Sequence, residues 1–153
     1  MTNKKDAIPQ TAIILGYGGA TPFVTLAVLS ILFEERFFIE ALIVYAAVII
    51  SFLGGIYWGA AMNSLSQNKF TAILKTNLCI SVTPALLAWG TLLIKNVKVA
   101  TILLSVGFLA QLIVDVIATK NGYFPYWYKA LRIPLTAIVL LCLIVAYIFH
   151  GPL

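Results

Sequence analysis

An acidic residue inside an apolar stretch, Asp115, is the first candidate for chemistry in this sequence. Gln111 precedes it by four residues, so the two side chains share one face of a helix. An acid within a membrane usually faces the protein interior and has a partner. Arg132 begins the next apolar stretch at the same border, and we predict an Asp115–Arg132 pair, with Lys75 as the alternative partner. The pair predicts either a structural clamp or a proton- or ligand-binding site.

Two aromatic residues of an earlier apolar stretch, Tyr57 and Trp58, are assigned to the same candidate site. At 1.5 Å per residue, Asp115 lies about 6 Å inside the inner end of its helix. The glycines and prolines of the neighbouring stretches fall in the same half of the membrane, so we expect a cavity that opens toward the cytoplasm. Its expected lining is Tyr57, Trp58, Gln111, Asp115 and Arg132.

These residues include neither a nucleophile with a base for catalysis nor a group of metal ligands. The single histidine, His150, falls at the outer end of the last predicted helix, on the opposite side of the membrane from Asp115. We expect it to be a surface residue. Cys79 and Cys142 both lie in apolar stretches and are expected to be small buried hydrophobic residues. We therefore expect no metal and no cofactor, and an enzyme is the least favoured class of function.

The composition identifies the elements that must position these residues. Of the 153 residues, 62% are hydrophobic and 10% are charged, whereas a soluble domain is about 45–50% apolar and about 25% charged. Helices are required in a bilayer because an open sheet leaves its backbone unsatisfied there. We predict an all-α integral membrane bundle in a single domain. Its five transmembrane helices are expected at residues 11–33, 41–62, 71–94, 99–119 and 131–149.

Rows of small residues at a spacing of four predict where these helices pack closely, because small side chains let backbones approach in lipid. The alternative is that the glycines form the wall of a binding cavity. The rows are Gly16 and Ala20 in the first stretch and Ala47, Ser51, Gly55 and Gly59 in the second.

Prolines within three of the predicted spans favour bends or locally opened helices. They are Pro22, Pro84 and Pro134. Pro125 is expected either to open a short interfacial helix or to extend the last helix inward, since proline is tolerated in a first helical turn.

The distribution of basic residues predicts the orientation in the membrane. Seven lysines and arginines fall on the side of the N-terminus and three on the other side, so we place the N-terminus in the cytoplasm and the C-terminus outside. The net charge of +5 has this topological origin. We therefore expect membrane lipids as partners, with a homo-oligomer or a second membrane protein as further candidates, and no nucleic acid.

Several motifs together resemble the transmembrane protein 69 family, described as domain of unknown function 3429. They are residues 18–23 (GGATPF), residues 45–59 (YAAVIISFLGGIYWG), Asp115 and residues 125–136 (PYWYKALRIPLT). The resemblance extends from about residue 10 to residue 142. It implies a small multi-pass protein of bacterial inner or mitochondrial membranes, and we expect a bacterial inner membrane. It implies no established activity.

Two functions follow from these features. The first is binding or movement of a small molecule or lipid through the cytoplasm-facing cavity, motivated by the buried acid and the proline-containing helices. The alternative is a non-catalytic structural or assembly partner of a membrane complex, motivated by the glycine rows and short loops.

Overall fold

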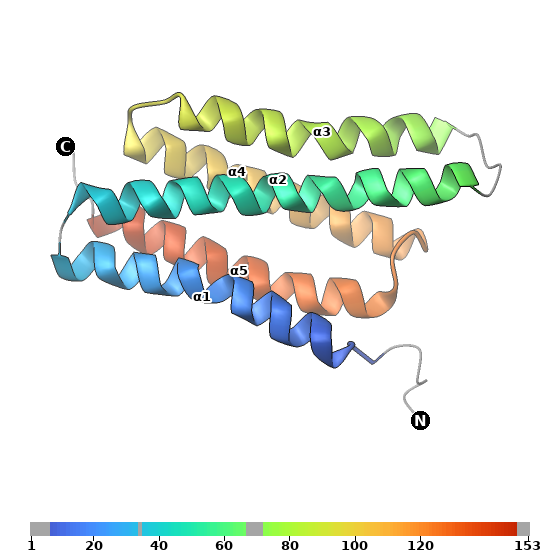
Figure 1. The fold of residues 1–153 in the computed structure, drawn as a ribbon, viewed down its shortest axis with the longest axis horizontal. Coiled ribbons are helices and arrows are strands. Elements are labelled where there is room, and N and C mark those ends of the chain that lie inside the picture. Colours follow the sequence, from blue (N-terminus) through green and yellow to red (C-terminus); the bar gives the residue numbers. More distant parts are fainter. Residues whose placement is uncertain (1–6, 34, 67–71, 150–153) are drawn as a thin grey trace.

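The fold is a bundle of antiparallel helices that lie side by side (Figure 1). The computed structural model describes residues 7–33, 35–66 and 72–149, and it describes the side chains of these residues except at 64–66 and 72–75. The helices within this part of the chain are α1 (Gln10–Phe33), α2 (Arg36–Ser66), α3 (Ala72–Leu92), α4 (Val97–Lys120) and α5 (Tyr126–Phe149).

The all-helical prediction is confirmed, and each predicted span lies on one helix. Four of the helices described are long and apolar enough to cross a membrane: α1, α2, α4 and α5. The apolar part of α3, Thr76–Leu92, is shorter. Four crossings are therefore supported by length and composition, and the crossing by α3 stays a prediction.

α2, α4 and α5 extend beyond their predicted spans because polar and aromatic residues continue these helices into the border region, whereas α3 ends at Leu92, before the predicted end at residue 94. α2 begins at Arg36, whose Nε lies 2.6 Å from Glu40 Oε1 one turn later. α5 begins at Tyr126, directly after Pro125, so this helix extends back to the proline rather than starting at residue 131. Between α4 and α5, Gly122 takes a positive φ of 77°, a conformation that favours glycine.

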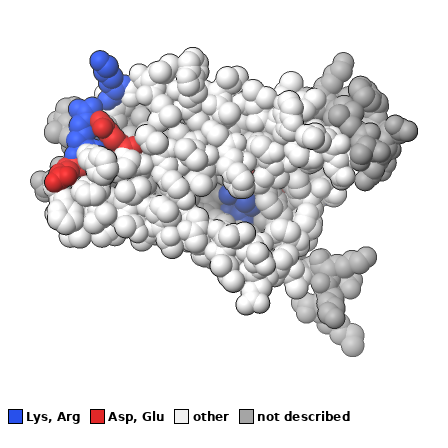
Figure 2. Space-filling view, viewed as in Figure 1, with Lys and Arg blue, Asp and Glu red and all other residues white. Residues whose placement is uncertain are grey.

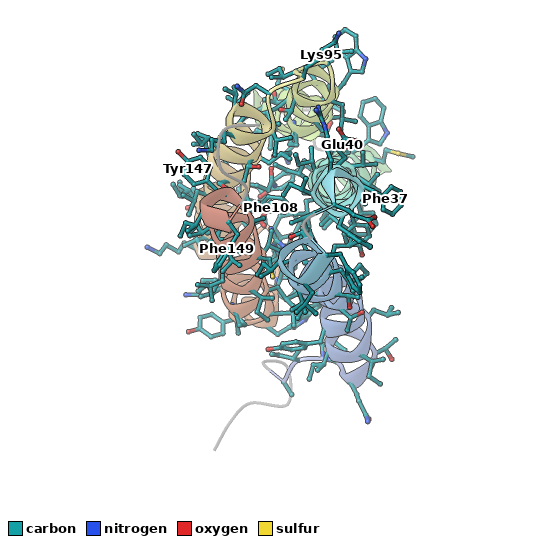
Figure 3. All side chains as sticks on the ribbon, turned by 90° about the vertical axis from the view of Figure 1, so that its left-hand side faces the viewer. Phe37, Glu40, Lys95, Phe108, Tyr147 and Phe149 are labelled. Atoms are coloured by element: carbon teal, nitrogen blue, oxygen red, sulfur yellow. The ribbon has the colours of Figure 1, made fainter. Side chains whose placement is uncertain are left out.

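α2 occupies the middle of the bundle and packs against α1, α3 and α4, while α5 packs against α1 and α4. Phe108 of α4 points into the centre of this arrangement, whereas Phe37 and Phe149 point outward (Figure 3). The rest of the core is aliphatic in the half near the α1–α2 turn. Its fully buried members are Ile39, Leu42, Ala46, Leu104, Leu143 and Ala146.

Helical structure continues through all three prolines. Pro22 has no N–H, so it cannot bond to the carbonyl of Gly18 four residues earlier. The hydroxyl of Thr21 donates to that carbonyl instead, at 2.7 Å. The predicted opening of the helix is therefore replaced by a local side-chain hydrogen bond. In Figure 1 the N-terminal part of α1 turns away from α2.

The predicted packing row on α2 is correct only at its start. Ala47 is buried, but Gly55 and Gly59 are exposed, and no described atom would lie within 4 Å of a Cβ added to either. The reason is geometric: a spacing of four advances about 40° per step around a helix, so the row leaves the core. The close approach occurs at Gly54, where an added Cβ would lie 2.5 Å from the carbonyl oxygen of Ser81.

The other small residues lie nearer their predicted places. Ala20 is buried, and Ser51 is half-buried with its hydroxyl on the carbonyl of Ala47 at 2.8 Å. A Cβ added to Gly16 would lie 3.0 Å from Leu135 Cδ1, so α1 and α5 are close at this point.

Candidate functional site

The carboxylate of Asp115 is completely buried and accepts hydrogen bonds from three helices. Its Oδ1 accepts from the hydroxyl of Tyr57 at 2.9 Å and from Gln111 Nε2 at 3.2 Å. Its Oδ2 accepts from Arg132 Nε at 2.7 Å and from the hydroxyl of Tyr128 at 3.3 Å. A carboxylate offers about four acceptor positions, so this charge is paired and its acceptor capacity is filled.

Arg132 is only partly used by this pair. The side chain is 8% exposed, and its contact with Asp115 is made through Nε. The terminal Nη2 is buried and has no hydrogen-bond partner in the described part of the chain. Arginine and carboxylate are frequently joined by two parallel hydrogen bonds. Here the Nε contact leaves a buried donor of the guanidinium group unsatisfied, which is costly without a partner.

Aromatic rings cover the polar cluster on the side of the α4–α5 loop. The ring of Phe124 lies edge-on to Tyr57, with a centroid distance of 5.1 Å, and 5.0 Å from the ring of Tyr128. Phe124 therefore stands between the loop and the two hydroxyl groups that reach Asp115. This arrangement covers the polar cluster with apolar ring surface on the side of the loop.

A pocket of about 200 Å³ lies between α1, α2 and α5 and reaches Arg132. We call it the α5 pocket. Its wall is apolar except near Tyr128 and Arg132, and it includes the backbone of Gly16 and Gly19. For comparison, an engineered cavity of about 150 Å³ holds one benzene molecule. The α5 pocket is therefore large enough for one ring or a short length of hydrocarbon chain.

The α5 pocket opens on the flank of the bundle. Leu15 of α1 and Phe52 of α2 line it and are both exposed. Figure 2 shows a hollow on this flank with a basic side chain at its floor, and Arg132 is the one basic residue of the pocket lining. The expected cavity that opens toward the cytoplasm is thus a pocket that opens sideways, where lipid surrounds a membrane protein.

A second pocket of about 150 Å³ lies on the other side of the cluster, between α2, α3 and α4. We call it the α3 pocket. Gln111 lines it, together with apolar residues that include Ile50 and Leu87. Two pockets therefore reach side chains that hold the same carboxylate.

Of the five predicted site residues, the structure brings four together: Tyr57, Gln111, Asp115 and Arg132. Trp58 is not among them, because it follows Tyr57 by about 100° around the helix and is 49% exposed.

Sequence reasoning missed Tyr128 because the last span was expected to begin at residue 131. Once α5 is extended to Tyr126, Tyr128 lies one turn before Arg132 on the same face.

The predictions for the two cysteines, for Lys75 and for His150 can also be compared with the structure. Cys142 is buried as expected, but Cys79 is exposed, so the prediction of a buried residue was wrong for it. The side chain of Lys75, the alternative partner of Asp115, lies outside the described residues, as does His150. Within the described part of the chain, no three His, Cys, Asp or Glu side chains gather as metal ligands.

The long apolar helices and the buried ion pair define a multi-pass helical membrane protein. The chain belongs to the family described as "Protein of unknown function (DUF3429)", whose model matches residues 8–148.

Two relatives carry the name "Transmembrane protein 69". The protein of Xenopus tropicalis is 37% identical over 145 residues, which cover 92% of this chain and 54% of the relative. The protein of Mus musculus is 28% identical over 153 residues, which cover 94% of this chain and 58% of the relative. This chain thus spans little more than half the length of these relatives. No solved structure matches it.

Proposed function

We propose that this protein binds an amphiphile, either a lipid or a lipid-soluble small molecule, in the α5 pocket. The observation that carries the proposal is the side chain of Arg132 at the wall of an otherwise apolar pocket, as part of a guanidinium group whose buried Nη2 has no partner among the described residues. Ligand sites are mostly apolar, with a few polar groups that fix orientation. An amphiphile supplies both the apolar body and the acceptor that Arg132 lacks.

In this proposal Asp115 is a positioning residue. Its carboxylate is already saturated by four donors and has no exposure, so it is not available to a ligand. It holds Nε of Arg132 at 2.7 Å and thereby fixes the guanidinium group at the pocket wall. The site is therefore a binding site rather than a catalytic one.

The experiment is identification of molecules that copurify with the chain from native membranes in mild detergent. Gly19→Leu fills the α5 pocket, because an added Cβ at Gly19 meets open space. Gly18→Leu is the matched control: its Cβ also meets open space, and Gly18 does not line the pocket. We expect a molecule enriched with the unaltered protein and with Gly18→Leu and lost with Gly19→Leu. Equal recovery from both variants would contradict the proposal.

A structural or assembly role is the second candidate, and the closed state of Asp115 favours it. A buried ion pair of 2.7 Å ties α4 to α5 without any ligand. In that case copurification would yield a protein partner, and neither glycine variant would change the recovered lipids.

For the topology, we propose five crossings with the N-terminus in the cytoplasm and a bacterial inner membrane as the location. The excess of basic residues on the N-terminal side supports this orientation, and the location rests on the family resemblance, although the two named relatives are eukaryotic. In Figure 1 α3 runs beside α2. Reporter fusions at the two termini test the proposal, because five crossings place them on opposite sides.

A further inference from the structure

The charge balance at Arg132 restricts what the α5 pocket can hold. Arg132 and Asp115 are paired at 2.7 Å inside the protein, so together they carry no net charge. An anionic ligand would add an uncompensated negative charge in a medium of low polarity, which is expensive. An uncharged acceptor adds no charge and still takes a hydrogen bond from the guanidinium group of Arg132 at the pocket wall. Building on the proposed function, this favours an uncharged ligand with a carbonyl oxygen.

The depth of Arg132 distinguishes among uncharged carbonyl compounds. Arg132 follows the start of α5 by six residues, or about 9 Å along the helix. α5 is about 36 Å long and the hydrocarbon layer is about 30 Å thick, so an α5 centred in the bilayer and perpendicular to it places Arg132 about 6 Å inside the hydrocarbon. The ester groups of glycerolipids lie near the polar border. A ketone on a lipid-soluble ring reaches this depth without lifting charged groups from water.

The opposite end of the pocket suits a ring or a flat hydrocarbon. Phe23 and Phe108 both line it, with their rings edge-on and 6.1 Å apart. Phe108 precedes Asp115 by two turns, so these rings lie about 10 Å along the bundle from the polar cluster. The pocket thus has one hydrogen-bond donor at one end and aromatic contact at the other, and it is open between α1 and α2 for a tail.

We propose that the α5 pocket binds an uncharged ring ketone with an apolar tail, a quinone-type lipid, whose ketone oxygen accepts a hydrogen bond from Arg132. The ring lies in the pocket between α1, α2 and α5. The tail leaves through the lateral opening beside Leu15 and Phe52, which are exposed. Because the ligand is uncharged, its binding adds no charge to the protein interior.

The test uses the full chain in nanodiscs of uncharged phosphatidylcholine with decylubiquinone as the probe. Retention is measured after gel filtration, with empty nanodiscs as the background. We expect the unaltered protein and Gly18→Leu to retain the quinone above background, and Gly19→Leu to lose at least about tenfold in affinity, a difference of about 1.4 kcal/mol. Equal retention by Gly18→Leu and Gly19→Leu would overturn the proposed site.

Two competitors test the class of ligand. Decanoate has a chain of similar length and a negative charge, and dioctanoylglycerol is an uncharged ester. We expect neither to displace decylubiquinone at equal concentration. If either one is retained in a Gly19-dependent way and the quinone is not, the ring-ketone proposal is wrong and amphiphile binding stands. If none of the three is retained, both proposals are wrong.

A double variant tests the role of Arg132 without leaving a charge unpaired. Asp115→Asn with Arg132→Gln replaces the ion pair with neutral side chains. We expect this protein to be recovered in folded form and to bind decylubiquinone about tenfold more weakly. Unchanged affinity in the folded double variant would show that Arg132 does not hold the ketone.

Discussion

The α5 pocket and the α3 pocket differ in one respect, and the proposed binding site rests on that difference. They have similar volumes, about 200 and 150 Å³, and both are mainly apolar. Each reaches a side chain that holds Asp115, Arg132 in the first and Gln111 in the second. Yet Arg132, which lines the α5 pocket, has an unsatisfied donor in its buried Nη2, whereas Gln111 Nε2 is engaged by the carboxylate.

The geometry of the ion pair distinguishes the α5 pocket from the α3 pocket. Arg132 approaches Asp115 with Nε, so the outer nitrogen of the guanidinium group is left over. If Nε and Nη2 approached the carboxylate together, both of these nitrogens would have a partner. In the α3 pocket the polar lining residues are Gln111 and Thr83, and each already makes a hydrogen bond within the protein, Gln111 Nε2 to Asp115 and the Thr83 hydroxyl to the carbonyl of Cys79.

The largest expected effect on stability comes from breaking the ion pair between Asp115 and Arg132. Arg132→Gln or Asp115→Asn alone leaves an uncompensated buried charge, and we expect each to lower the free energy of unfolding by about 3–5 kcal/mol. The measurement is thermal or denaturant unfolding of the purified protein in detergent.

The double variant is the control for that prediction. Because neither charge remains, its loss is expected to be smaller than the sum of the two single losses by more than about 1 kcal/mol. Additive losses would mean that the pair does not act as a clamp.

Loss of the hydroxyl of Tyr57 is expected to have the next largest effect. Tyr57→Phe removes a 2.9 Å hydrogen bond to a buried charge, and such bonds contribute about 1.5–3 kcal/mol. Tyr45→Phe is the matched control, because its hydroxyl donates at 2.9 Å to the neutral carbonyl of Gly19. We expect a loss of about 1 kcal/mol there. A larger loss at Tyr45 would argue against a special role for the carboxylate.

A pair of glycines tests the packing beside the α3 pocket. In Gly54→Ala the added Cβ would lie 2.5 Å from the backbone of Ser81, so α2 and α3 must separate at a cost of about 1–3 kcal/mol. Gly55→Ala has open space and should be neutral or stabilising by up to about 1 kcal/mol. Unfolding of both proteins under one condition measures the difference, and equal stabilities would contradict the close approach.

The smallest expected effect sharpens the comparison of the pockets themselves. Ala110 lines the α3 pocket and is exposed, so Ala110→Leu reduces that space from the edge. We expect retention of decylubiquinone to stay within about twofold of the unaltered protein. A loss as large as that of Gly19→Leu would assign the ligand to the α3 pocket instead.

Hydropathy was enough to predict the helices because hydrocarbon excludes charge from all but a few positions. Hydropathy predicts the ends of the helices less accurately. α5 starts at Tyr126 rather than residue 131, since the aromatic residues between them favour the border of the membrane as much as its interior. Tyr128 was lost from the predicted site for that reason alone.

Side-chain direction was the part of the site that sequence could not supply. The expectation that Asp115 meets Arg132 followed from the cost of an unpaired charge, and the structure places them 2.7 Å apart. Trp58 was assigned with Tyr57 because they are neighbours in sequence, but adjacent helical residues point about 100° apart. The lateral opening of the α5 pocket depends on how α1 diverges from α2. A local sequence pattern does not predict how two helices diverge.

The spacing of Asp115 and Arg132 also has a consequence for biogenesis. The two residues lie on consecutive helices joined by a short turn with Gly122 at its tight point. A charge placed alone at a helix centre opposes entry into the bilayer by about 2.5–3.5 kcal/mol. If α4 and α5 enter together as a hairpin, the opposite charges neutralise each other before either meets lipid. We therefore expect the ion pair to favour insertion of these two helices as one hairpin.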